Sequence, residues 1–174
     1  MAVDIYTIPD WGPLVTYRKN DIVTNGGKFY YSTVNHISDP SDFNNDLNQG
    51  KWGGNITFNG EEKPFFIWKP SYNYSATVQP NVKTIRFGDG YSQDVKDGIN
   101  NILLVFDFNF ENRDLKEYSA ILHFLHSRAG YEKFFFIPPQ PYGVVKKFIC
   151  KEWTPSQQFI DNYSIRAKFE ERAL

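Results

Sequence analysis

The chain has 174 residues, a formal net charge of −1, 41% hydrophobic residues and 22% charged residues. This composition is that of a folded protein of one or two domains, and the near-neutral charge excludes the basic footprint of a protein that binds nucleic acid. A single cysteine excludes an internal disulfide framework, and no apolar run approaches the roughly 20 residues that cross a bilayer, so we expect no membrane insertion.

The start of the chain, residues 1–11, has no basic region followed by an apolar core, so no secretory signal is expected. Aromatic residues make up 18% of the chain, with 16 Phe and 11 Tyr. Flat rings pack well on pleated sheets, so this composition favours a mainly β fold.

The first unit, residues 1–54, is predicted to be a small three-stranded β module. Two short β-prone runs, 21–23 and 28–31, flank Asn25-Gly26-Gly27, and an Asn-Gly pair readily adopts the positive φ of a tight hairpin turn. A unit of this size buries little apolar surface. We therefore expect its aromatic residues to make it fold: Trp11, Tyr17, Phe29, Tyr30 and Trp52.

The boundary between two units is predicted near residues 50–64, which are rich in Gly and Asn and poor in apolar side chains. Glycine lowers the cost of irregular backbone. We therefore expect a linker at residues 55–64 and a second domain at residues 65–174.

Strand patterns open the second unit. Residues 82–87 form a strand candidate that ends at Gly88-Asp89-Gly90, a turn sequence. From residue 104 to residue 110, Leu or Phe occupies every second position, with Val, Asp and Asn between them. A period of two predicts a half-buried antiparallel strand.

One helix is predicted next. Asp114 is a suitable N-cap with Glu117 close to capping-box spacing, and Gly130 suits a left-handed C-terminal cap. Apolar side chains recur at helical spacing between them: Leu115, Tyr118, Ile121, Leu122, Phe124 and Leu125.

Further strands are predicted at residues 133–137, 144–150 and 163–169, the first ended by a Pro-Pro pair and the last with alternating polarity. Antiparallel strands around one helix predict a β-sandwich or barrel with the helix packed on it.

Two patterns with nucleophilic or metal-binding side chains have simpler explanations. His123 and His126 stand three apart on the predicted helix, but no further ligand set accompanies them, so packed or surface histidines are expected. Cys150 ends an apolar run, which favours a small buried thiol over a nucleophile.

Two polar patterns are explained in the same way. Among the acidic residues around the predicted helix, Asp114 and Glu117 have a capping role and Asp107 lies on the polar face of a strand, so a carboxylate pair for glycoside hydrolysis is not favoured. The Gly88–Gly90 segment lacks a following helix, which a phosphate-binding loop requires. We expect no catalytic residue, no metal and no cofactor, and thus no enzyme.

The most distinctive motif of the chain is Arg86-Phe87-Gly88-Asp89-Gly90-Tyr91, with Gln93 and Gly98-Ile99-Asn100 after it. Other segments accompany it in order: Phe66-Ile67-Trp68, Val82–Ile85, Phe124-Leu125, Gly130, Phe134–Pro139, Cys150–Trp153 and Ala167–Glu170. Over about residues 62–174, this ordered set resembles the minor tail protein M family of lambda-like phages.

The resemblance implies a structural role and a tail-tube-related fold. It implies a ring, hexameric in our expectation, at the tail tip or baseplate of the virion, assembled in the host cytoplasm. Its partners would be further copies of the chain, the tail tube protein, the tape-measure protein and tip-hub proteins, without nucleic-acid specificity. We expect the turn-rich loops to form the interface: Arg86, Phe87, Asp89, Tyr91, Gln93, Asn100, Pro138 and Pro139.

The first unit resembles a different group, the small carbohydrate-binding modules attached to chitinases, through Trp11, Tyr17, Asn20–Val23, Gly27–Tyr30, Pro40 and Trp52-Gly53. Where such modules have an adjacent Trp pair for stacking on sugar, this chain has Val34-Asn35. A scaffold is therefore favoured, with a module that contacts a host-envelope glycan as the alternative. The candidate glycan contacts are Tyr17, Tyr31 and Trp52.

Overall fold

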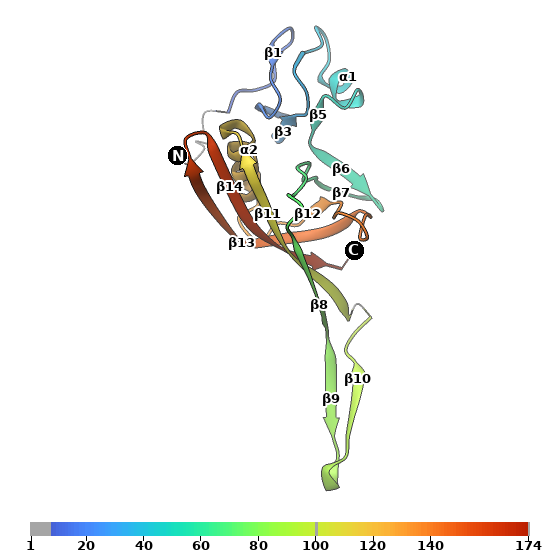
Figure 1. The fold of residues 1–174 in the computed structure, drawn as a ribbon. Helices are drawn as coiled ribbons and strands as arrows, with labels where there is room; N and C mark the ends of the chain where they lie inside the picture. The colour runs from blue at the N-terminus through green and yellow to red at the C-terminus, as the bar shows by residue number, and fades with distance from the viewer. Residues whose placement is uncertain (1–7, 100, 174) are drawn as a thin grey trace.

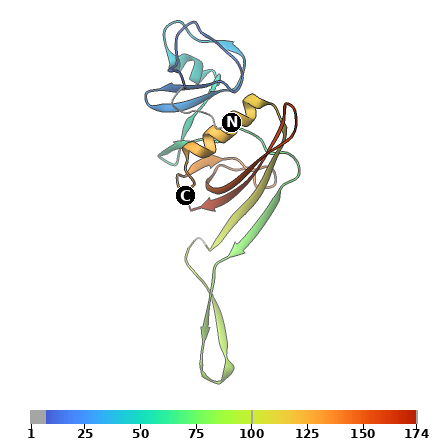
Figure 2. The same cartoon turned by 90° about the vertical axis from the view of Figure 1, so that its left-hand side faces the viewer.

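The computed structural model describes residues 8–99 and 101–173. A small N-terminal module, a domain with a curled sheet and a helix, and a long hairpin follow one another in space (Figure 1). Figure 2, turned by 90°, shows the same order, with the module and the hairpin at opposite ends of the molecule.

The module contains a three-stranded antiparallel sheet of order β2-β3-β5, a two-stranded pair β1-β4 and one short helix. Its elements are β1 Thr16–Tyr17, β2 Ile22–Asn25, β3 Lys28–Ser32, β4 His36–Ile37, α1 Phe43–Asn48 and β5 Trp52–Gly53. The predicted hairpin is confirmed, because Gly26 and Gly27 both have positive φ, 58° and 74°, as its tight turn requires.

Residues 55–64 do not form the irregular linker that we expected from their Gly and Asn content. They form a hairpin of β6 Asn55–Phe58 and β7 Glu61–Pro64, with positive φ at both Asn59 and Gly60 in the turn. An ion pair between Lys147 and Glu61 attaches this hairpin to the domain. The composition that indicated irregular backbone is that of a tight turn with short polar strands.

The domain is built on a five-stranded antiparallel sheet of order β12-β13-β14-β11-β8. Its strands are β8 Ser75–Pro80, β11 Ile102–Arg113, β12 Phe134–Phe136, β13 Lys146–Phe159 and β14 Asn162–Arg172. The sheet curls into a half-barrel (Figure 1). The predicted mainly β fold is therefore confirmed.

The alternation predicted for residues 104–110 is confirmed in β11. Leu104, Phe106, Phe108 and Phe110 are buried, and the residues between them are half-buried. The buried side chains of β11 face the centre of the core.

The predicted helix is also confirmed, as α2 Leu115–Ser127. The Asp114 side chain accepts a hydrogen bond from the backbone N–H of Glu117 at 2.7 Å, and Gly130 beyond the C-terminus has a φ of 76°. Residues 120–125 of the helix are buried.

Phe66 lies at the centre of the domain core and is 1% exposed. Six aromatic rings have centroids within 5.1 to 6.1 Å of its own: Trp68, Phe110, Phe124, Phe134, Phe136 and Phe169. Five of these six contacts are edge to face, a packing that stabilises the core beyond the burial of the rings.

The module is fixed to the domain by buried polar contacts. Tyr31 Oη lies 2.8 Å from His123 Nδ1 on α2, and Trp68 Nε1 donates to Asn20 Oδ1 at 3.1 Å. Tyr31 belongs to the same buried cluster as α2. The module thus packs against the helix as part of one body.

His123 makes this junction sensitive to acid. Burial, followed by the charges of Arg128 and His126, lowers the pKa of His123 from about 6.5 to about 4. Between these pH values the unfolded chain binds a proton that the folded chain does not. The free energy of unfolding is therefore undiminished by His123 above pH 6.5, and it falls as the pH drops from 6.5 towards 4.

We expect this loss to appear in urea unfolding at pH 7 and pH 4.5. The wild-type chain should lose about 2 kcal/mol more of its unfolding free energy than His123→Gln, which has no proton to take up. An equal loss in both proteins would show that His123 is not the responsible group.

Candidate functional site

The hairpin at the far end of the molecule is formed by β9 Val82–Arg86 and β10 Ser92–Lys96. These strands pair only with each other in the part of the chain that the structure describes, and they project away from the sheet (Figures 1 and 2). We call this hairpin the arm. An isolated two-stranded hairpin is marginally stable in water, which makes the arm a candidate contact surface.

A short turn, Gly88–Gly90, closes the tip of the arm. Asp89 and Gly90 have positive φ, 67° and 79°, and the Phe87 N–H donates to the Tyr91 carbonyl oxygen at 2.8 Å. This closure brings the Phe87 and Tyr91 rings to a centroid distance of 5.7 Å.

The register of the arm separates its side chains into two faces. Residues that pair directly share a face, so Ile85 with Gln93 and Lys83 with Val95 lie on the same side as the Phe87–Tyr91 pair. The exposed fractions are 38% for Ile85, 50% for Phe87 and 65% for Tyr91. We call Ile85, Phe87, Tyr91 and Val95 the apolar face of the arm.

The opposite face of the arm is mainly polar, with Val82 as its one apolar residue. Thr84 Oγ1 donates to Asp94 Oδ1 at 2.6 Å, and Arg86 pairs with Ser92. The arm is therefore an amphipathic ribbon, although both of its faces meet solvent in the isolated chain.

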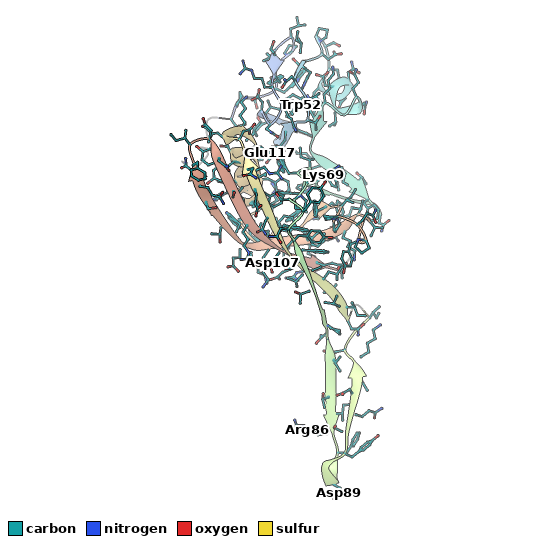
Figure 3. All side chains as sticks on the ribbon, in the orientation of Figure 1. Trp52, Lys69, Arg86, Asp89, Asp107 and Glu117 are labelled. Carbon is teal, nitrogen blue, oxygen red and sulfur yellow. The ribbon has the colours of Figure 1, made fainter. Side chains whose placement is uncertain are left out.

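Five of the predicted interface residues come together on the arm, and Figure 3 labels two of them, Arg86 and Asp89, at its far end. These five are Arg86, Phe87, Asp89, Tyr91 and Gln93. Asn100 lies outside the described residues. The two proline residues lie elsewhere.

Pro138 and Pro139 line an apolar groove of about 1140 Å³ on the body of the domain. Pro138 is itself buried and Pro139 half-buried, so only part of the predicted proline contact is accessible. The groove is lined by residues 65–74, 111–113, 136–140 and 143.

One wall of the groove is residues 65–74, which have no regular secondary structure beyond an isolated bridge at Phe65. Hydrogen bonds hold this wall: Tyr74 Oη donates to the Gln140 carbonyl at 2.9 Å, and Arg113 Nη2 donates to the Lys69 carbonyl at 2.9 Å. Tyr72 in this wall is fully exposed, and Ile137 across the groove is 44% exposed. No local sequence pattern indicates this groove.

The candidate glycan contacts have no free ring face. Tyr17, Tyr31 and Trp52 are 6%, 2% and 4% exposed, and Figure 3 shows Trp52 within the module. The rings of Tyr17 and Trp52 pack edge to face at 5.0 Å, and Tyr31 packs on Trp68. Tyr17 and Trp52 belong to the core of the module, and Tyr31 belongs to the buried cluster that it shares with the domain.

A polar cleft of about 530 Å³ lies where the module meets the domain. An ion pair between Lys28 and Glu62 lines it, as does Arg128, which contacts Glu132 at 2.8 Å. Tyr131 is its most accessible ring, at 73% exposed.

The cysteine and histidine residues considered as nucleophiles or metal ligands are packed or hydrogen-bonded within the fold. Burial raises the pKa of the Cys150 thiol to about 12, which makes it a poor nucleophile. The ring nitrogen Nδ1 of His126 lies 2.7 Å from the Leu122 carbonyl oxygen on its own helix. Over residues 8–99 and 101–173, no three His, Cys, Asp or Glu side chains gather in a way that could hold a metal ion.

Neither helix in the described ranges combines the length and the apolar character needed to cross a membrane.

Comparison with known proteins gives matches over the domain and the arm. A family model described as phage minor tail protein matches residues 64–173. The chain is also 27% identical over 106 residues to the tail tip protein M of Escherichia phage lambda, an alignment that covers 61% of this chain and 94% of that relative. Residues 1–63, which include the module, lie outside the family match.

Proposed function

Because the chain belongs to the phage minor tail protein family, a family of structural components of the virion tail, we propose that it forms an oligomeric ring at the tail tip. The observation that supports this proposal is the arm, whose apolar face has no partner among the residues that the structure describes. A surface of this kind is typical of a protein that functions in an assembly.

A closed ring explains why an exposed ribbon is tolerated. Unpaired strands and apolar faces promote uncontrolled association. When each copy makes the same head-to-tail contact and the rotation closes, every arm is covered and no free end is left. Strand β8 pairs only with β11 among the described strands, so its outer edge is available to a neighbour in the same way.

We place the ring, with six copies, between the tail tube protein and the tip-hub proteins, in contact with the tape-measure protein. The similarity to a tail tip protein supports this position over one along the tube. Assembly would take place in the host cytoplasm before the tail joins the rest of the virion.

A phage that lacks this chain tests the proposal. Electron microscopy of its lysates should show particles without complete tails, and supplying the wild-type chain in trans should restore tails and infectivity. Complete, infective tails in the absence of the chain would contradict a structural role at the tip.

A host glycan is the second candidate partner, and the polar cleft is the observation that favours it. Tyr131 presents a ring beside Asn55, Glu62 and Lys133, and sugars are bound by such combinations of ring face and hydrogen-bonding groups. The module would then be a scaffold that forms one side of the cleft.

On a glycan array, Tyr131→Ala should weaken binding of the full chain about fivefold, equivalent to ~1 kcal/mol of stacking. Tyr131→Phe, which retains the ring, should bind as the wild type does. If the wild-type chain binds no glycan, this second function is excluded and the module is a scaffold alone.

A further inference from the structure

We propose that the apolar face of each arm docks into the groove of a second copy of this chain. The inference rests on the proposed function, since it specifies the contact through which neighbouring subunits of the ring bind each other. Nothing else among the described residues of the chain covers either surface.

The arm and the groove have matching chemistry. The arm presents Ile85, Phe87 and Tyr91 on one side, and the groove is mainly apolar with Tyr72 and Ile137 accessible in it. Aromatic and aliphatic side chains that enter an apolar pocket typically dominate the affinity of an interface.

The charges are complementary as well. Lys83 lies on the same side of the arm as its apolar face, and Glu111 lines the groove. Neither has an ion-pair partner within residues 8–99 and 101–173. Docking would bring opposite charges together and favour one orientation of the arm.

An arm that fills the groove must come from another copy. Tyr74 of the groove directly precedes β8, and the arm directly follows β8, so the strand separates the two surfaces. Six register pairs between β8 and β11 fix this separation. At about 3.3 Å per residue, Asp89 at the tip lies roughly 45 Å along the chain from the start of β8.

Figure 3 agrees with this geometry: Lys69 of the groove wall lies on the body of the domain, and Asp89 lies at the tip of the arm, far from that body. An arm could therefore reach its own groove only if β8 left the sheet. The contact is head-to-tail, which is the kind that closes into rings.

Disulfide trapping in assembled tails tests this contact. Tyr91→Cys is combined in turn with Tyr72→Cys and with Ile137→Cys, and the single variants are the controls. The native Cys150 is buried and does not compete. After mild oxidation, at least one combination should give a ladder of covalent oligomers that ends at the ring size. Each single variant should give a yield of these oligomers at least tenfold lower.

The outcomes separate this inference from the proposed function. If a lysine-reactive cross-linker shows oligomers in tails but neither cysteine combination gives a ladder, the ring stands and arm-to-groove docking is wrong. A dimer formed by Tyr91→Cys alone would show that arms pair with arms, which also overturns it. If both methods find only single copies, the proposed ring itself fails.

A charge exchange gives a second measurement. Lys83→Glu and Glu111→Lys should each reduce the cross-linked ladder, and the double variant should restore it towards the starting yield. A double variant no better than either single one would contradict the predicted pairing of Lys83 with Glu111.

Discussion

Replacing Phe87 and Tyr91 together with Ser should lower the yield of infective particles at least about a hundredfold. Aromatic anchors of an interface contribute about 2 kcal/mol or more each when truncated, and every 1.4 kcal/mol is tenfold in affinity. Both rings are at least half exposed in the single chain, so the folded subunit does not depend on them. Plaque titre and negative-stain microscopy of complemented null phage measure the effect.

Two controls separate assembly from folding in this experiment. The Tm of the purified double variant should stay within about 2 °C of the wild type, because exposed substitutions change stability by about 0.5 kcal/mol or less. Thr84→Ser with Ser92→Ala, on the polar face of the same arm, should give normal titres. Normal titres from the Phe87 and Tyr91 double variant would contradict the proposal that the arm is an interface.

Phe66→Ala should have the largest effect on stability, a loss of about 3 to 5 kcal/mol. Removing a buried Phe forfeits its burial and leaves a cavity. Here the ring lies among six others, so the site cannot collapse easily. For a chain of this length, the loss corresponds to a fall in Tm of roughly 10 °C or more, which differential scanning calorimetry measures.

Phe87→Ala is the matched control, because it removes the same side chain from an exposed position. Its Tm should remain close to that of the wild type. Equal shifts for Phe66→Ala and Phe87→Ala would mean that Phe66 is not central to the core.

The elements that sequence analysis predicted correctly are those whose local pattern matches their tertiary surroundings. The period-two run of β11 is buried on one face, and α2 begins at the cap that Asp114 provides. In these segments, propensity, polarity and burial all favour the same structure.

The strands that the sequence does not predict are stabilised by pairing with strands distant in the sequence. β8 has little alternation and exists because β11 pairs with it along its whole length. The second half of β13 is polar and contains Pro155, and a proline in such a segment predicts the end of a strand. Proline is tolerated there because β12 pairs only with the first residues of β13, so Pro155 lies on an open edge.

The candidate site was predicted in part. The sequence predicts the first strand of the arm, its turn and interface residues at its tip, but not the second strand, β10. Local pattern also cannot show that a hairpin leaves its sheet. The groove has no recognisable pattern in the sequence, because its lining comes from three separate stretches of chain that only the fold brings together. Tyr17, Tyr31 and Trp52 were candidate contacts only for the alternative glycan-binding function, because sequence alone does not distinguish an exposed ring from a core ring.

Immunogold electron microscopy of intact virions, with antibody against the N-terminal module, tests the central claim most directly. The module lies at the end of the molecule opposite the arm (Figure 2), so it should be accessible when the arms are engaged. Gold confined to the distal end of the tail is the predicted result. Gold along the whole tail, or unlabelled particles from cells that contain the protein, would contradict a ring at the tail tip.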